Sequence, residues 1–104
     1  MTIKMYKKLV RDRIPEIIEE SGKRYNCHVA DEDEFRGALL QKLVEEVEEF
    51  IEDPSIEELA DIYEVLDALR KEFRLHGSMA QQIVKRIEKG SFENRYILDW
   101  AEKE

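Results

Sequence analysis

The chain has 104 residues, of which 42% are hydrophobic and 40% are charged, and its formal net charge is −8. This length suits one domain, and four glycines with two prolines are too few for a turn-rich all-β protein. A lone cysteine excludes an intramolecular disulfide, and the cysteine and histidines lack zinc-site spacing. Without a signal-peptide pattern or a membrane-length apolar run, we expect a single cytoplasmic domain over residues 1–104. The acidic balance argues against general nucleic-acid binding.

The first half of the chain predicts two helices. A short one begins near Arg13, with Asp12 as its cap, and stops at Gly22. A long one covers residues 34–52, because its apolar residues recur every three or four positions after the Asp31/Asp33 cluster.

Two further helices follow the break at residues 53–55. Ser55 and Glu58 form an S-x-x-E capping box at the start of the third, whose apolar stripe continues to Gly77. Ser78 is the expected cap of the fourth, which Gly90 ends. The prediction is therefore an all-α antiparallel helical bundle, completed by oligomerisation because so short a chain buries only a modest core.

Two segments leave a choice between strand and helix. Residues 24–29 alternate apolar and polar side chains, which is a weak strand signal. Residues 92–98 either pair with residues 25–29 as a small β-hairpin or form a short helix.

Charge is distributed unevenly along the chain. Residues 43–69 contain no lysine or arginine and carry −11, which leaves +3 for the remainder. Basic residues flank this stretch on both sides: Lys4, Lys7, Lys8, Arg11 and Arg13 before it, and Lys85, Arg86, Lys89 and Arg95 after it. The layout suits a metal held by carboxylates beside a polyanion held by bases. A solvated acidic helix face is the alternative.

Four acids of the middle stretch are expected to meet. With a rise of about 1.5 Å per residue and a reversal at residue 54, Glu49 comes level with Glu58, and Glu46 comes level with Asp61. Carboxylate ligands suit Mg²⁺ or Mn²⁺. The competing interpretation of Glu58 is a capping role only.

The same acids carry a resemblance to a known family. The runs EEVEE (residues 45–49) and ELAD (residues 58–61) resemble the EExxE…ExxD signature of the all-α nucleoside triphosphate pyrophosphohydrolases, the MazG and phosphoribosyl-ATP pyrophosphohydrolase superfamily. Residues 8–15 (KLVRDRIP) and 89–92 (KGSF) are similar to the KLVRDKIP-like opening and GGF-like turn of its small house-cleaning branch, although Ser91 replaces the second glycine.

The resemblance implies a site and an activity. In the implied fold, the helices pair between subunits. The implied Mg²⁺ ligands are Glu46, Glu49, Glu58 and Asp61, and Glu45 is a further acidic residue of the site. The implied reaction is attack by metal-activated water on the α-phosphorus of a nucleoside triphosphate, which gives nucleoside monophosphate and pyrophosphate.

Roles for the remaining residues follow from that reaction. Glu45 is the candidate for positioning or deprotonating the water. Lys8 and Arg11 are the first candidates for holding the triphosphate, with Lys89 and Arg95 as the second pair. The implied branch suggests non-canonical nucleotides as substrates, and the expected partner is a second copy in a homodimer or higher oligomer.

Other functions remain open from the sequence. One is a non-enzymatic acidic helical module that occupies a basic site on a partner and needs no divalent ion. Another is a related pyrophosphohydrolase that acts on dUTP or a phosphoribosyl compound.

Overall fold

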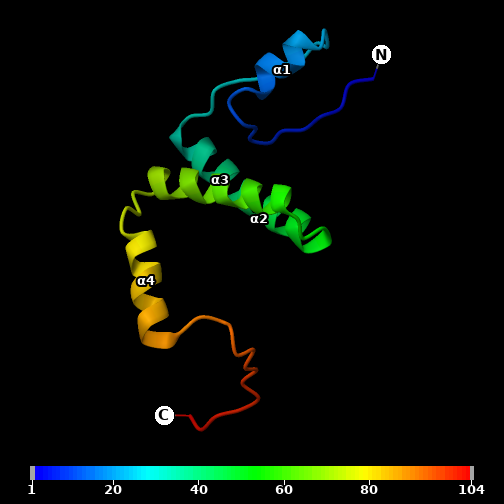
Figure 1. Cartoon of the computed structure of the whole chain (residues 1–104). Helices are drawn as coiled ribbons and strands as arrows, with labels where there is room; N and C mark the ends of the chain where they lie inside the picture. The colour runs from blue at the N-terminus through cyan, green and yellow to red at the C-terminus, as the bar shows by residue number, and fades with distance from the viewer. Residues whose placement is uncertain (1, 104) are drawn as a thin grey trace.

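The structure, a computed structural model, describes residues 2–103 as four helices joined by non-helical segments (Figure 1). The helices are α1 Ile14–Glu20, α2 Glu32–Glu52, α3 Ile56–Glu72 and α4 Ser78–Lys89. No strand occurs between residues 2 and 103, so the all-α class is confirmed. No helix in this range is long and apolar enough to cross a membrane.

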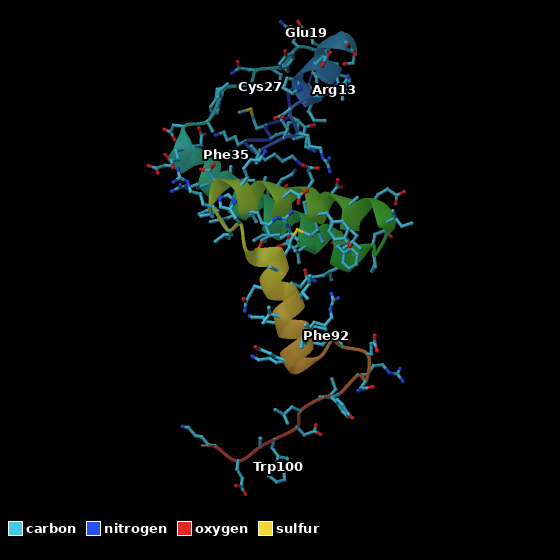
Figure 2. The ribbon with its side chains drawn as sticks, turned by 60° about the vertical axis from the view of Figure 1, so that its left-hand side comes forward. Arg13, Glu19, Cys27, Phe35, Phe92 and Trp100 are labelled. Atoms are coloured by element: carbon cyan, nitrogen blue, oxygen red, sulfur yellow. The ribbon has the colours of Figure 1, made fainter. Side chains whose placement is uncertain are left out.

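The prediction of a β-hairpin between residues 25–29 and 92–98 is wrong. Both segments are non-helical and neither forms a strand, so the short helix considered for residues 92–98 is also absent. Figure 2 shows why they do not pair, since Cys27 lies beside α1 while Phe92 lies beyond α4 at the opposite end of the molecule. A strand needs a neighbouring backbone for its N–H and C=O groups, and neither segment has one.

The caps of the two long helices agree with the sequence. The Asp31 side chain accepts a hydrogen bond of 2.9 Å from the Glu34 N–H, and α2 begins at residue 32, two positions earlier than predicted. The Ser55 hydroxyl accepts one of 3.2 Å from the Glu58 N–H at the start of α3. These side chains satisfy N–H groups that a helix leaves unpaired in its first turn.

The caps predicted for the two short helices are wrong, because backbone turns replace them. At α1 the Ile14 N–H donates to the Arg11 carbonyl at 3.0 Å, and no side chain caps the helix. At α4 the Ser78 N–H donates to the Leu75 carbonyl at 3.2 Å, which makes Ser78 the first helical residue rather than the cap.

The core lies between α2 and α3, which pack antiparallel as the central pair of the molecule (Figure 1). Its most buried apolar side chains are Leu39 from α2, 2% exposed, and Val65 from α3, 7% exposed. The Cα radius of gyration is 18.8 Å, against about 13 Å for a compact domain of this length. One chain therefore leaves most of its apolar surface in solvent.

The α2–α3 pair has two different sides. At 100° of rotation per residue, each of the two helices carries a second row of apolar residues, about 110° around the helix from the residues that contact the other helix. Both rows lie in the same rotational direction from the contact face. Because the helices run antiparallel, the two rows therefore lie on one side of the pair. This surface, the apolar side, consists of exposed residues Leu40, Val44, Val47, Ile51, Leu59, Tyr63 and Leu66. The opposite surface, the acidic side, includes Glu45, Glu49, Asp61 and Glu64.

The end of the chain contributes nothing to this core. Every residue from 74 to 103 is exposed, and α4 leaves the helix pair at a steep angle before the tail that carries Trp100 (Figures 1 and 2). Phe92 is 98% exposed. The structure therefore presents both an amphipathic helix and an aromatic tail without a covering surface in their own chain.

Candidate metal centre

Three carboxylates from the two central helices converge at the end of the pair near the α2–α3 connection. Glu46 comes from α2, while Glu58 and Asp61 come from α3, where a spacing of three residues places them on one helix face. One oxygen of each lies within 4.8 Å of the others. The antiparallel reversal thus brings together three of the four ligands proposed from the sequence.

Glu46 is the most buried charged residue described. It is 6% exposed, and its Oε1 atom lies 3.3 Å from Lys42 Nζ, one helical turn earlier. Its Oε2 atom has no hydrogen-bond partner among residues 2–103, and neither has Glu58 Oε2. Buried polar oxygens are normally paired, because leaving one unpaired costs about 1–3 kcal/mol. A cation between these carboxylates would remove that penalty.

The pKa values of two of these acids respond to their surroundings. Burial raises the pKa of Glu46, and the negative charges of Glu49 and Asp61 raise it further, although Lys42 acts in the opposite direction. Burial also raises the pKa of Glu58, followed by the charge and the hydrogen-bonding contact of the Glu49 carboxyl. Both shifts indicate that the native structure holds these carboxylates at an energetic disadvantage in their charged form.

Glu49 lies outside the group formed by Glu46, Glu58 and Asp61, which we call the trio. The residue is exposed, and its charge contributes to the raised pKa of Glu58 and of Glu46. Glu49 therefore lies at the solvent edge of the cluster, next to Glu58.

The basic N-terminal segment crosses the acidic side. Lys8 Nζ lies 3.7 Å from Glu45 Oε1, Arg11 Nη2 lies 2.6 Å from Asp61 Oδ1, and Arg11 Nη1 lies 4.0 Å from Glu64 Oε1. Lys8 and Arg11 are thus beside the residues that the sequence assigned to catalysis and to the metal.

Lys89 and Arg95 are not brought to this cluster. Lys89 ends α4 and Arg95 lies in the tail beyond it. In Figure 1, α4 and this tail lead away from the helix pair. A sequence pattern of basic flanks cannot distinguish a segment that folds back from one that leads away.

Sequence reasoning missed Lys42, which supplies the positive charge closest to the buried end of the cluster. Its signal is its position: it is the last base before the stretch from 43 to 69, four residues before Glu46. That spacing places both side chains on one face of a helix.

The arrangement places hard oxygen donors next to basic side chains of the type that bind phosphate. The three carboxylates provide few enough ligands for Mg²⁺ or Mn²⁺ to keep positions for water and phosphate oxygens. Surface hollows of about 370 and 380 Å³ are lined by Phe35, Arg36 and Glu72 and by Asp67, Arg70 and Met79, respectively. Both lie toward the end of α3, away from the three carboxylates.

Comparison with protein-family models, with curated proteins and with solved structures finds no match to this chain.

Proposed function

We propose that this protein is a Mg²⁺-dependent nucleoside triphosphate pyrophosphohydrolase that releases nucleoside monophosphate and pyrophosphate, with Mn²⁺ as an alternative ion. The observation that carries the proposal is the convergence of one oxygen each from Glu46, Glu58 and Asp61 within 4.8 Å, together with the buried Oε2 of Glu46 that has no hydrogen-bond partner among residues 2–103. The resemblance to the MazG-like superfamily, and to its house-cleaning branch, motivates the choice of reaction and of non-canonical nucleotides as substrates.

The donor set fits the ion. Glu46, Glu58 and Asp61 would hold it, and Glu49 at the solvent edge would be the fourth ligand. When bound, the ion would activate water and neutralise phosphate charge. Lys8 and Arg11 would bind the triphosphate oxygens with charge-assisted hydrogen bonds. Glu45 would orient or deprotonate the attacking water from its place beside Lys8.

A second copy of the chain is part of this proposal. The apolar side of α2–α3 is exposed in one chain, and the surface hollows described above lie away from the carboxylates. Association through the apolar side would bury that surface and leave the acidic side open to substrate. We also place the protein in the cytoplasm, since exposed Cys27 is a free thiol and suits a reducing compartment.

A panel of canonical and modified triphosphates, including dUTP, assayed with Mg²⁺ and with product identification, tests the proposal. The expected products are a nucleoside monophosphate and pyrophosphate, with activity lost in chelator. Release of orthophosphate and a diphosphate would contradict the assigned bond cleavage. No turnover on any member, with no effect of Mg²⁺ on the protein, would favour the acidic interaction module.

A further inference from the structure

We propose that Arg11 is an internal substitute for the divalent ion: it pairs with Asp61 in the free protein, gives up that carboxylate when the ion binds, and then becomes available to phosphate. This inference rests on the proposed metal site and adds an exchange of cations to it. Its basis is the contact of 2.6 Å between Arg11 Nη2 and Asp61 Oδ1, made with one of the three clustered carboxylates.

Arg11 and Lys42 both contact the trio, and they differ in how firmly they are held. Lys42 extends from α2 with its side chain 18% exposed, so it remains beside Glu46 as long as α2 is folded. Arg11 belongs to the non-helical N-terminal segment, and its side chain is 53% exposed. Arg11 is therefore the base that can move without disturbing a helix.

Replacement of Arg11 by a divalent ion at Asp61 is expected to be favourable. An exposed ion pair is weak because solvent screens it and both side chains lose freedom, so its loss opposes metal binding only slightly. An ion among the three carboxylates would interact with all of them at once, including the buried oxygens that Arg11 does not satisfy.

Glu64 determines where Arg11 would go. It lies 4.0 Å from Arg11 Nη1 on the acidic side, outside the trio that would hold the ion. After release from Asp61, Arg11 would stay near Glu64, beside the cluster, with donors free for phosphate oxygens. Ion binding would thus prepare the base that receives the triphosphate.

Mn²⁺ binding to the full chain, measured by calorimetry and by electron paramagnetic resonance without nucleotide, tests the exchange. Arg11→Gln should bind Mn²⁺ more tightly than wild type, by up to about fivefold, the equivalent of one exposed ion pair. Arg13→Gln is the matched control, because Arg13 pairs with Glu16 in α1 and not with the cluster. Arg11→Lys, which keeps the charge, should remain near wild type.

Limited trypsin digestion supplies a second measurement on the wild-type protein. Mn²⁺ should accelerate cleavage after Arg11 and leave cleavage after Arg95, in the exposed tail, unchanged. Equal Mn²⁺ affinity in wild type and Arg11→Gln, with unchanged cleavage after Arg11, would overturn the exchange and leave the metal site intact. Failure of every variant and of wild type to bind Mn²⁺ would overturn the metal site itself.

Discussion

Glu46 occupies the unusual position of a carboxylate in the contact between two helices, where an apolar side chain would ordinarily pack. It is 6% exposed, and with Leu39 and Val65 it makes up the three buried residues of the described part of the chain. Lys42 contacts one of its oxygens, Oε1, at 3.3 Å. A buried acid with one free oxygen lowers stability unless another group uses it, and the proposed metal site rests on this feature of Glu46.

Substitution of the α3 ligands distinguishes a metal site from a capping box. Glu58→Gln and Asp61→Asn should each reduce Mg²⁺-dependent turnover sharply, because each removes an anionic donor from the trio. Stability without metal should hold or rise in Glu58→Gln, since repulsion with Asp61 and Glu46 is relieved. Turnover and thermal melts in chelator measure the two effects.

Glu52→Gln is the control for these variants. It is exposed at the C-terminal end of α2 and outside the trio, so its turnover should match wild type. Wild-type turnover in both Glu58→Gln and Asp61→Asn would show that the ligands are assigned wrongly.

The pH dependence of the metal-free protein should report the raised pKa of Glu46. An acid with a raised pKa in the folded state binds protons more readily there than in the unfolded state, so stability rises as pH falls. From pH 7 down to about pH 5, wild type should gain stability relative to Glu46→Gln, which cannot titrate. Denaturant melts of both proteins in chelator give this difference. A difference that is constant with pH, or that grows in favour of the variant as pH falls, would contradict the burial of a charged Glu46.

At the scale of the element, the first turn of α3 contains both a helix cap and a residue of the proposed metal site. Ser55 caps the helix at the N–H of Glu58, so the same residue supplies a capped amide and a carboxylate of the trio. The capping role proposed for Glu58 would use its carboxylate to accept from the Ser55 N–H, whereas the observed cap joins the Glu58 N–H to the Ser55 hydroxyl. Glu58 Oε2 has no hydrogen-bond partner among residues 2–103, so this oxygen is open to the proposed metal role, and the Ser55 cap fixes the turn from which it extends.

Loss of this cap should affect stability and metal binding together. Ser55→Ala should cost about 1 kcal/mol of unfolding free energy and weaken Mn²⁺ binding, because a frayed first turn no longer holds Glu58. Asp31→Ala removes the equivalent cap of α2, far from the trio along the helix, and should cost a similar amount without changing Mn²⁺ affinity. Denaturant melts and calorimetry compare the two. Equal Mn²⁺ affinities in both variants would show that the cap does not position the ligand.

At the scale of the whole molecule, the exposed apolar side of the helix pair is the basis for the expected association with a second copy of the chain. We expect sedimentation at micromolar concentration to show a dimer or higher oligomer rather than a 12.4 kDa monomer. Val44→Lys places a charge on the apolar side and should shift the equilibrium toward monomer. Sedimentation of wild type and Val44→Lys at the same concentration gives the change in the monomer fraction.

Gln41→Lys is the matched control for Val44→Lys, since Gln41 is exposed on α2 but lies outside the apolar side. It should sediment as wild type does. A clean monomer in wild type, or equal dissociation by both substitutions, would contradict association through the apolar side.

The sequence by itself determined the features that depend on neighbours along the chain. Apolar periodicity located α2 and α3, the side chains of Asp31 and Ser55 marked their starts, and residues 53–55 marked the reversal. These are interactions over three or four residues, so local physics suffices. The same reversal allowed Glu46 and Asp61 to be placed level with each other from rise and spacing alone.

Tertiary structure decided the features that depend on how far segments fold back. It separated Lys8 and Arg11, which contact residues of the acidic side, from Lys89 and Arg95, which belong to α4 and the tail. These two segments lead away from the helix pair in Figure 1. Tertiary structure also made Glu46 buried and Glu49 exposed, although the two are one helical turn apart. A linear pattern of charges contains neither result, because burial and long-range pairing depend on the orientation of a helix against its neighbour and on the path of non-helical segments.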